Sequence, residues 1–176
     1  MLLTVATARS GLPHFRRGDF ATAARQLRAA LAIAETENDG PIALASAAEA
    51  ASVLALSGDL REAARFAHLA RTTRSDTFPT NVLWRSALAL VAAHEGRTEE
   101  ARLLSDEARV RASASDHLTF RGETLEQAAT VRRLAGDTAG EAEALAEALA
   151  LYERKGNRVG GERVRLMLSE RGGRDN

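Results

Sequence analysis

Gly58-Asp59-Leu60 is the stretch that decides the fold, because it recurs in related form along the chain. Equivalent phrases stand at Gly18-Asp19-Phe20, Gly96-Arg97-Thr98 and Gly136-Asp137-Thr138, at intervals of 40, 38 and 40 residues. Each phrase separates two stretches with helical apolar periodicity, where a C-cap glycine and the N-cap of the next helix are expected. The sequence therefore predicts a repeat whose unit is a helical hairpin.

Acidic residues follow these turns at the spacing of helix caps. Asp59 with Glu62, and Thr138 with Glu141, have the N-cap to N3 spacing of a capping box. A capping carboxylate is already occupied by backbone N–H groups, so we expect these acids to be structural rather than catalytic.

Small residues keep a fixed register with the turn glycines. Seven residues before each glycine stand Gly11, Ala51, Ala89 and Ala129. Five residues after it stand Ala23, Ala63, Ala101 and, as an exception, Glu141. Twelve residues after it stand Ala30, Ala70, Ala108 and Ala148. Small side chains at these points predict a close approach of the two helices of a hairpin, which a larger residue would over-pack at a cost of about 1–3 kcal/mol.

The periodicity predicts a single domain over residues 1–176. Helices are expected at about 2–16, 20–37, 41–57, 60–75, 80–95, 98–114, 117–135 and 139–155, followed by a last helix near 159–170. They group into repeats at about 1–37, 41–75, 80–114 and 117–155, with the last helix as a cap.

The order small residue, turn glycine, aspartate, bulky residue, alanine, alanine resembles the tetratricopeptide repeat, lengthened from 34 to about 40 residues. The resemblance covers nearly the whole chain, although the consensus tryptophan, tyrosine and terminal proline are not kept. It implies an all-α fold, a right-handed α-solenoid of four antiparallel helical hairpins with a C-terminal capping helix. It also implies that the first helix of each hairpin lines a concave inner surface.

The C-terminal part carries a second resemblance. Leu134-Ala135-Gly136-Asp137 and the run from Ala148 to Asn157 are similar to the repeat region of large bacterial signalling ATPases, found with nucleotide-cyclase domains or in LuxR-type regulators. Neither an ATPase nor an effector domain is present in this sequence. The resemblance implies a regulatory repeat segment, and it leaves open whether that segment stands alone or as a fragment of a larger regulator.

Composition disfavours several functional classes. Positive and negative residues balance at 24 each, so no global field favours nucleic acid or an anionic membrane. The chain has no cysteine, no phosphate-binding loop and no secretory or membrane-spanning segment, so we expect a cytoplasmic protein. The histidines His14, His68, His94 and His117 fall in different hairpins and predict no metal site. We expect no cofactor and no catalytic activity.

The predicted inner face contains the candidate partner-binding residues. Counting back from each turn glycine selects Val5, Ala8, Leu12, Phe15, Ala48, Ser52, Leu83, Ser86, Leu90, Glu123, Glu126, Thr130 and Arg133. The first three hairpins contribute mostly apolar or small residues, and an apolar strip of that extent favours contact with a partner. The alternative is that neighbouring helices already cover part of it.

These residues predict a protein-interaction or regulatory module that binds a peptide or helix, with the charged residues of the fourth hairpin setting its direction. The alternative function is a sensor that binds a small molecule or signalling peptide. A homodimer through the N-terminal hairpin or the concave face is a further option, because Leu2, Leu3 and Val5 open the repeat without a polar cap. Trp84 and Phe78 are expected to be core residues between repeats, or else a binding hot spot.

Overall fold

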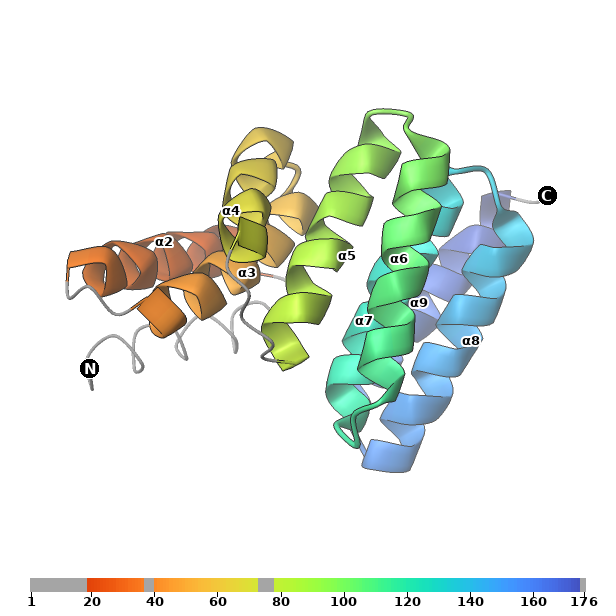
Figure 1. Ribbon diagram of the computed structural model, residues 1–176. Coiled ribbons are helices and arrows are strands. Elements are labelled where there is room, and N and C mark those ends of the chain that lie inside the picture. The colour runs from red at the N-terminus through yellow and green to blue at the C-terminus, as the bar shows by residue number, and fades with distance from the viewer. Residues whose placement is uncertain (1–18, 37–39, 73–77, 175–176) are drawn as a thin grey trace.

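The computed structural model describes residues 19–36, 40–72 and 78–174. In this part of the chain the fold is all-α, with eight helices packed as sequential antiparallel pairs (Figure 1). The helices are α2 (Phe20–Thr36), α3 (Gly40–Ser57), α4 (Leu60–Thr72), α5 (Phe78–His94), α6 (Thr98–Ser113), α7 (Leu118–Leu134), α8 (Thr138–Lys155) and α9 (Arg158–Arg174). The helix expected at 2–16 lies outside the described residues.

The helix boundaries agree with the expected ones to within a few residues. The largest difference is at 159–170, where α9 continues to Arg174. Residues 73–75 of the helix expected at 60–75 lie outside the described residues. Pro79 was expected to precede a helix, but it lies in the first turn of α5. A proline is tolerated there because the N–H groups of the first helical turn have no partner within the helix.

The repeated turn phrases form the predicted helix ends. Gly58, Gly96 and Gly136 have positive φ angles of 88°, 74° and 74°, the left-handed conformation that closes a helix C-terminus. At the first of these turns the N–H of Asp59 donates to the carbonyl oxygen of Leu54 at 3.0 Å. The chain can therefore reverse directly after each helix and pack the next one against it.

One of the expected caps is shifted by a residue. The N-cap of α8 is Asp137 rather than Thr138, and its carboxylate accepts a hydrogen bond from the N–H of Gly140 at 2.9 Å. The carboxylate also accepts from Arg132 at 2.9 Å, which lowers the pKa of Asp137 below its ordinary value. The Asp137 carboxylate caps the helix and also pairs with an arginine, and a threonine hydroxyl carries no charge for the second contact.

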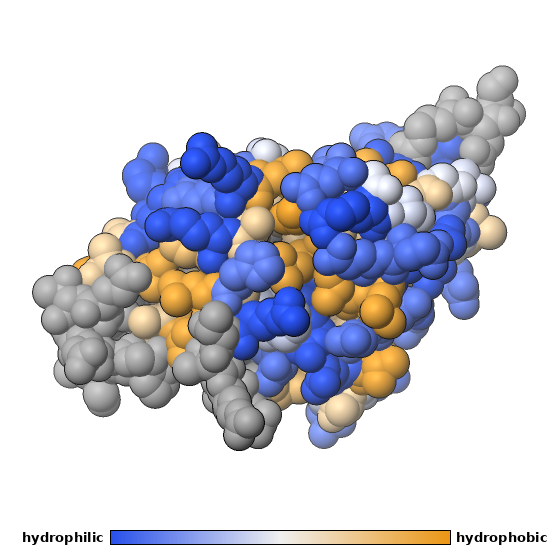
Figure 2. Space-filling model, turned by 45° about the horizontal axis from the view of Figure 1, so that its top comes forward, coloured by the Kyte–Doolittle hydropathy of each residue, from blue (hydrophilic) through white to orange (hydrophobic). Residues whose placement is uncertain are grey.

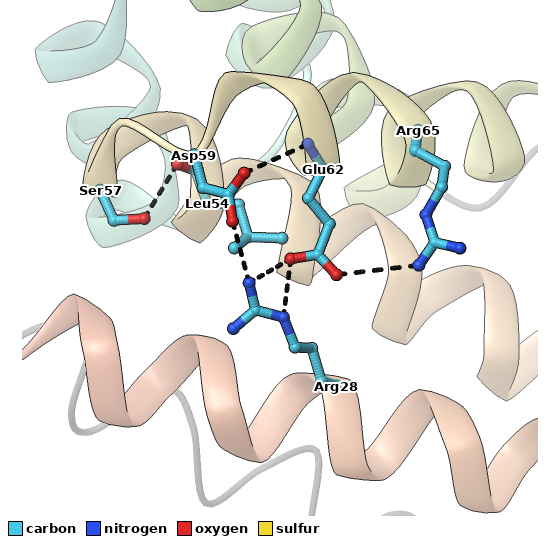
Figure 3. Close-up of polar contacts among 6 residues, drawn as sticks. All are labelled: Arg28, Leu54, Ser57, Asp59, Glu62 and Arg65. Atoms are coloured by element: carbon cyan, nitrogen blue, oxygen red, sulfur yellow. Dashed lines mark hydrogen bonds and ion pairs between the residues drawn. The ribbon is translucent and has the colours of Figure 1, made fainter.

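The cap of α4 also holds α2 (Figure 3). Asp59 accepts from the N–H of Glu62 at 3.3 Å, as the capping spacing predicts. Arg28 of α2 reaches both carboxylates, with its Nε 2.8 Å from Glu62 and its Nη2 3.1 Å from Asp59. The hydrogen bond from Arg28 lowers the pKa of Glu62. The two helices that flank α3 are thus joined through its C-terminal turn.

Alanine builds most of the interior. Ala51, Ala63 and Ala101 are fully buried, and Ala89 is 1% exposed. The exception, Glu141, is also buried, with its carboxylate 3.9 Å from Arg133 and 4.0 Å from Arg171. The predicted small residues are therefore buried between helices where the structure describes them. The charge of the buried glutamate is balanced by two nearby arginines.

Successive first helices of the hairpins pack on one another. α3 contacts α5, α5 contacts α7, and α7 contacts α9, while α4, α6 and α8 each pack against the first helix of their own pair (Figure 1). None of the described helices is long and apolar enough to cross a bilayer. The layer of α3, α5, α7 and α9 carries most of the predicted binding residues.

We expect Ala89→Trp to lower the free energy of unfolding by about 1–3 kcal/mol or more, because the indole must displace packed helices. Ala150→Trp, at an exposed position of α8, is the matched control and should change it by less than about 0.5 kcal/mol. Urea denaturation followed by circular dichroism measures both. Equal tolerance at the two positions would contradict the helix register.

Candidate functional site

The predicted inner face is only partly open. Val5, Ala8, Leu12 and Phe15 lie outside the described residues. Ala48, Ser52, Ser86 and Leu90 are between 0% and 4% exposed, so the expectation that they line an open strip is wrong. The small residues of α3 and α5 let these helices and α7 lie side by side, and the contact between them covers the strip. Leu83, Glu123, Glu126 and Thr130 remain partly exposed, and Arg133 is exposed.

A cleft of about 270 Å³ opens between α3, α5 and α7. We call it the inner cleft, and the described residues that line it are Glu49, Ser52, Val53, Phe78, Pro79, Leu83, Ser115, His117, Phe120, Glu123, Thr124 and Gln127. Three of the predicted binding residues, Ser52, Leu83 and Glu123, are among them. The cleft thus brings together residues from three consecutive hairpins.

The floor of the inner cleft is tied by a polar contact between distant helices. Gln127 Nε2 of α7 donates to Ser52 Oγ of α3 at 2.9 Å, and both residues are buried. A buried amide and hydroxyl that satisfy one another avoid the desolvation cost that either would carry alone. The contact fixes the distance between α3 and α7 and so the width of the cleft.

Two aromatic rings form one wall. Phe78 at the start of α5 and Phe120 in the first turn of α7 lie with ring centroids 5.5 Å apart and planes inclined by 59°. The turn before α7 is capped by His117, whose Nδ1 accepts the N–H of Phe120 at 3.3 Å. Both rings are partly buried, so the wall offers apolar surface in a fixed orientation.

Phe78 and Trp84 do not form the aromatic pair that was considered from the sequence. Trp84 is 8% exposed and belongs to the main core cluster, with the guanidinium of Arg85 4.0 Å and that of Arg71 5.6 Å from its ring centre. Phe78 instead packs with Phe120 beside the inner cleft. The core prediction is therefore confirmed for Trp84. Phe78 is half-buried, packs against a smaller core cluster of Val82, Ala108 and Ala112, and also lines the inner cleft.

Glu49 is an acidic residue of the inner cleft whose pKa is raised by burial. It is partly buried on α3, and burial raises its pKa to about 7. Among the described residues no cation pairs with its carboxylate, and none of the lining residues is a lysine or arginine. The other titratable groups of the lining are His117 and Glu123. Sequence reasoning missed Glu49, although a lone glutamate in the alanine-rich stretch 43–55 was a usable signal.

A second hollow of about 160 Å³ continues the surface from α7 to α9 and shares Glu123 and Gln127 with the inner cleft. Its other described lining residues are Leu56, Glu126, Thr130, Arg163 and Met167. The two hollows therefore form one surface that runs across α3, α5, α7 and α9.

Glu126, a predicted binding residue, is already held by two partners. Arg163 of α9 donates to it in a bidentate pair, from Nε at 2.6 Å and from Nη2 at 2.7 Å. The hydroxyl of Tyr152 donates to the same carboxylate. The hydrogen bond that Arg163 donates to Glu126 raises the pKa of Arg163, and burial is the main cause that raises the pKa of Tyr152. These contacts make Glu126 a structural link between α7, α8 and α9.

Two glycines admit the Tyr152 ring. A side chain at Gly122 would place its Cβ 2.6 Å from the ring, and one at Gly160 would lie 2.9 Å from it. Tyr152 is fully buried between these backbones. Its hydroxyl can therefore reach Glu126 only because both neighbouring helices carry glycine at the point of closest approach.

Other apolar residues reach the surface outside the two hollows. On the face viewed in Figure 2, apolar atoms lie in patches between hydrophilic side chains. The exposed large apolar residues of the described chain are Leu69, Leu103, Val110, Val159 and Leu166. They are spread over three helices, α4, α6 and α9, whereas the inner cleft gathers its apolar residues in one concavity.

Comparisons with known proteins identify no family for this chain. No model of a protein family matches the sequence, and a search of curated proteins finds no relative of significant similarity. Among the described residues, no group of three or more histidine, aspartate or glutamate side chains is placed to hold a metal ion. The functional argument therefore rests on the geometry of the inner cleft.

We expect Arg163→Met to lower the free energy of unfolding by on the order of 3 kcal/mol, because it leaves the Glu126 carboxylate partly buried without its cation. Adding Glu126→Gln should cost less than the sum of the two single changes, since the second change removes the unpaired charge. Urea denaturation of the four proteins of this cycle measures the coupling. Strict additivity would contradict a structural role for the pair.

We expect Glu49→Gln to stabilise the protein at pH 8 but not at pH 5. Because the pKa of Glu49 is raised from 4.5 to about 7, the folded protein holds a proton that the unfolded chain loses between these values. The wild type should therefore lose up to about 3 kcal/mol as the pH rises through this window. Urea denaturation at both pH values measures the difference. Glu143→Gln, at an exposed site, should shift stability equally at both.

Proposed function

We propose that the protein is a cytoplasmic interaction module that binds a peptide or helix of another protein across the inner cleft. The observation that carries this proposal is the inner cleft itself, which combines apolar walls with a few polar groups on three helices. Surfaces of this kind anchor apolar side chains of a ligand and orient it through the polar groups. The proposal involves no covalent chemistry and no cofactor.

The continuity of the surface supports an elongated ligand. The inner cleft and the second hollow share Glu123 and Gln127, so a ligand seated in one extends naturally into the other. An extended peptide or a helix has this shape and presents side chains at regular intervals. Leu83 in the inner cleft and Met167 in the second hollow offer apolar contact to such side chains.

We also propose that the paired helices form a tetratricopeptide-like solenoid. The repeat interval of 38–40 residues and the successive contacts of α3, α5, α7 and α9 support this arrangement. In solenoids of helical hairpins, such first helices form the surface that receives ligands. A place within a bacterial regulatory protein is part of the same proposal, and it rests on the resemblance of the C-terminal repeat.

A small-molecule sensor is the second candidate, because a concavity of about 270 Å³ lies near the lower limit of ligand pockets. Ligand length separates the two functions. A sensor should gain thermal stability from a compound that fills the inner cleft alone, whereas a docking module should gain it from peptides that also cover the second hollow. Thermal denaturation with the two kinds of ligand measures this.

We expect the wild type to enrich binders from a phage-displayed library of random 12-residue peptides, and Leu83→Asp to lose them. The new carboxylate would place an uncompensated charge in the apolar wall. Circular dichroism confirms that the variant is folded. The matched control is Leu103→Asp on α6, where the native leucine is 62% exposed, and it should retain the peptides.

Hydrogen exchange of the wild type with a selected peptide maps the contact independently of any substitution. Protection in α3, α5 and α7 would support the proposal. Peptides that are lost with Leu103→Asp but kept with Leu83→Asp would place binding elsewhere. Failure of the wild type to enrich any peptide would contradict the docking function and would direct attention to self-association, which sedimentation measures.

A further inference from the structure

Among the described residues, the inner cleft contains a partly buried glutamate that has no cationic partner. Glu49 is the only lining residue of α3 that carries a charge, and the described residues provide it with no cation. A carboxylate that is partly removed from water without a counter-ion is costly, and its pKa of about 7 reflects that cost. A positively charged ligand group would remove the penalty.

The other titratable residues of the lining are an acid and a histidine that caps a helix. Glu123 adds a second acidic group, and its negative charge also acts on Arg163 and Tyr152. His117 uses Nδ1 to cap α7. The whole chain is neutral, with 24 lysines and arginines against 24 acidic residues. Because the described lining of the cleft contains two glutamates and neither lysine nor arginine, this cleft is acidic within a neutral protein.

The walls fit a cation that is attached to an apolar stem. Phe78 and Phe120 present aromatic surface, and Leu83 and Pro79 extend the apolar side. Lysine and arginine bury their methylene groups against such surfaces while the charged end seeks a carboxylate or the face of a ring. An acidic side chain would meet Glu49 and Glu123 and would be repelled.

We propose that the inner cleft selects a lysine or arginine side chain of its peptide ligand, with Glu49 as counter-ion and with an adjacent apolar ligand residue packed against Phe78 and Phe120. This inference rests on the proposed docking function and specifies the chemistry of its ligand. Glu49 is the specificity-determining group, and the aromatic wall supplies the apolar contact.

The test uses the random 12-residue peptide library on the full chain. Wild-type selections should be enriched in peptides that carry lysine or arginine beside an apolar residue. A selected peptide is then synthesised with its basic residue kept or replaced by a neutral residue of similar length, citrulline for arginine or norleucine for lysine. Isothermal titration measures the Kd of each peptide for the wild type, Glu49→Gln and the exposed control Glu143→Gln.

The wild type should bind the basic peptide at least about tenfold more tightly than the neutral one, as expected for a charge-assisted contact. Glu49→Gln should lose this preference while binding the neutral peptide as the wild type does, and Glu143→Gln should keep it. A purely structural effect of the substitution would weaken both peptides equally. Glu49→Lys, selected against the same library, should enrich acidic peptides instead.

The experiment distinguishes failure of the proposed lysine or arginine preference from failure of the proposed docking function. Enrichment of apolar peptides without basic residues, or an unchanged preference in Glu49→Gln, would overturn this inference and leave the docking function standing. Enrichment of acidic peptides by the wild type would overturn it as well. If the wild type enriches no peptide, both the inference and the proposed function are overturned.

Discussion

The close approach of neighbouring helices through alanine is the constraint on which the rest of the structure depends. Ala51, Ala63, Ala89 and Ala101 are buried at the points where the helices of a pair and their neighbours meet. Alanine buries little area per residue, so stability must come from many such contacts distributed along the chain. A larger side chain at any of them would separate two helices at once, because the interior is close-packed.

The inner cleft is lined mostly by residues larger than alanine. α3, α5 and α7 carry small buried residues where they pack together, and Glu49, Phe78 and Phe120 line the cleft between them. The Ser52–Gln127 hydrogen bond holds the floor between them. The same rule of packing therefore explains why Ala48, Ser86 and Leu90 of the predicted inner face are closed, while Leu83 and Glu123 line a concavity.

Two glutamates on the same layer show how environment decides the role of a carboxylate. Glu126 receives a bidentate arginine and a tyrosine hydroxyl, and it links three helices. Glu49 lies in a surface of similar burial but without a cation among the described residues, and its pKa rises to about 7. The first is a satisfied structural group, whereas the second is a partly buried acid whose charged form is disfavoured by burial.

The sequence by itself determined the all-α class, the hairpin unit, the turn glycines and most helix boundaries, because these depend on local periodicity and backbone conformation. It also selected Leu83 and Glu123, which line the inner cleft. Only the tertiary structure decided that Ala48, Ser86 and Leu90 are covered, that Arg163 holds Glu126, and that Glu49 lines the inner cleft without a cation among the described residues. Those outcomes depend on the distance between helices and on partners tens of residues apart, which helical periodicity does not encode.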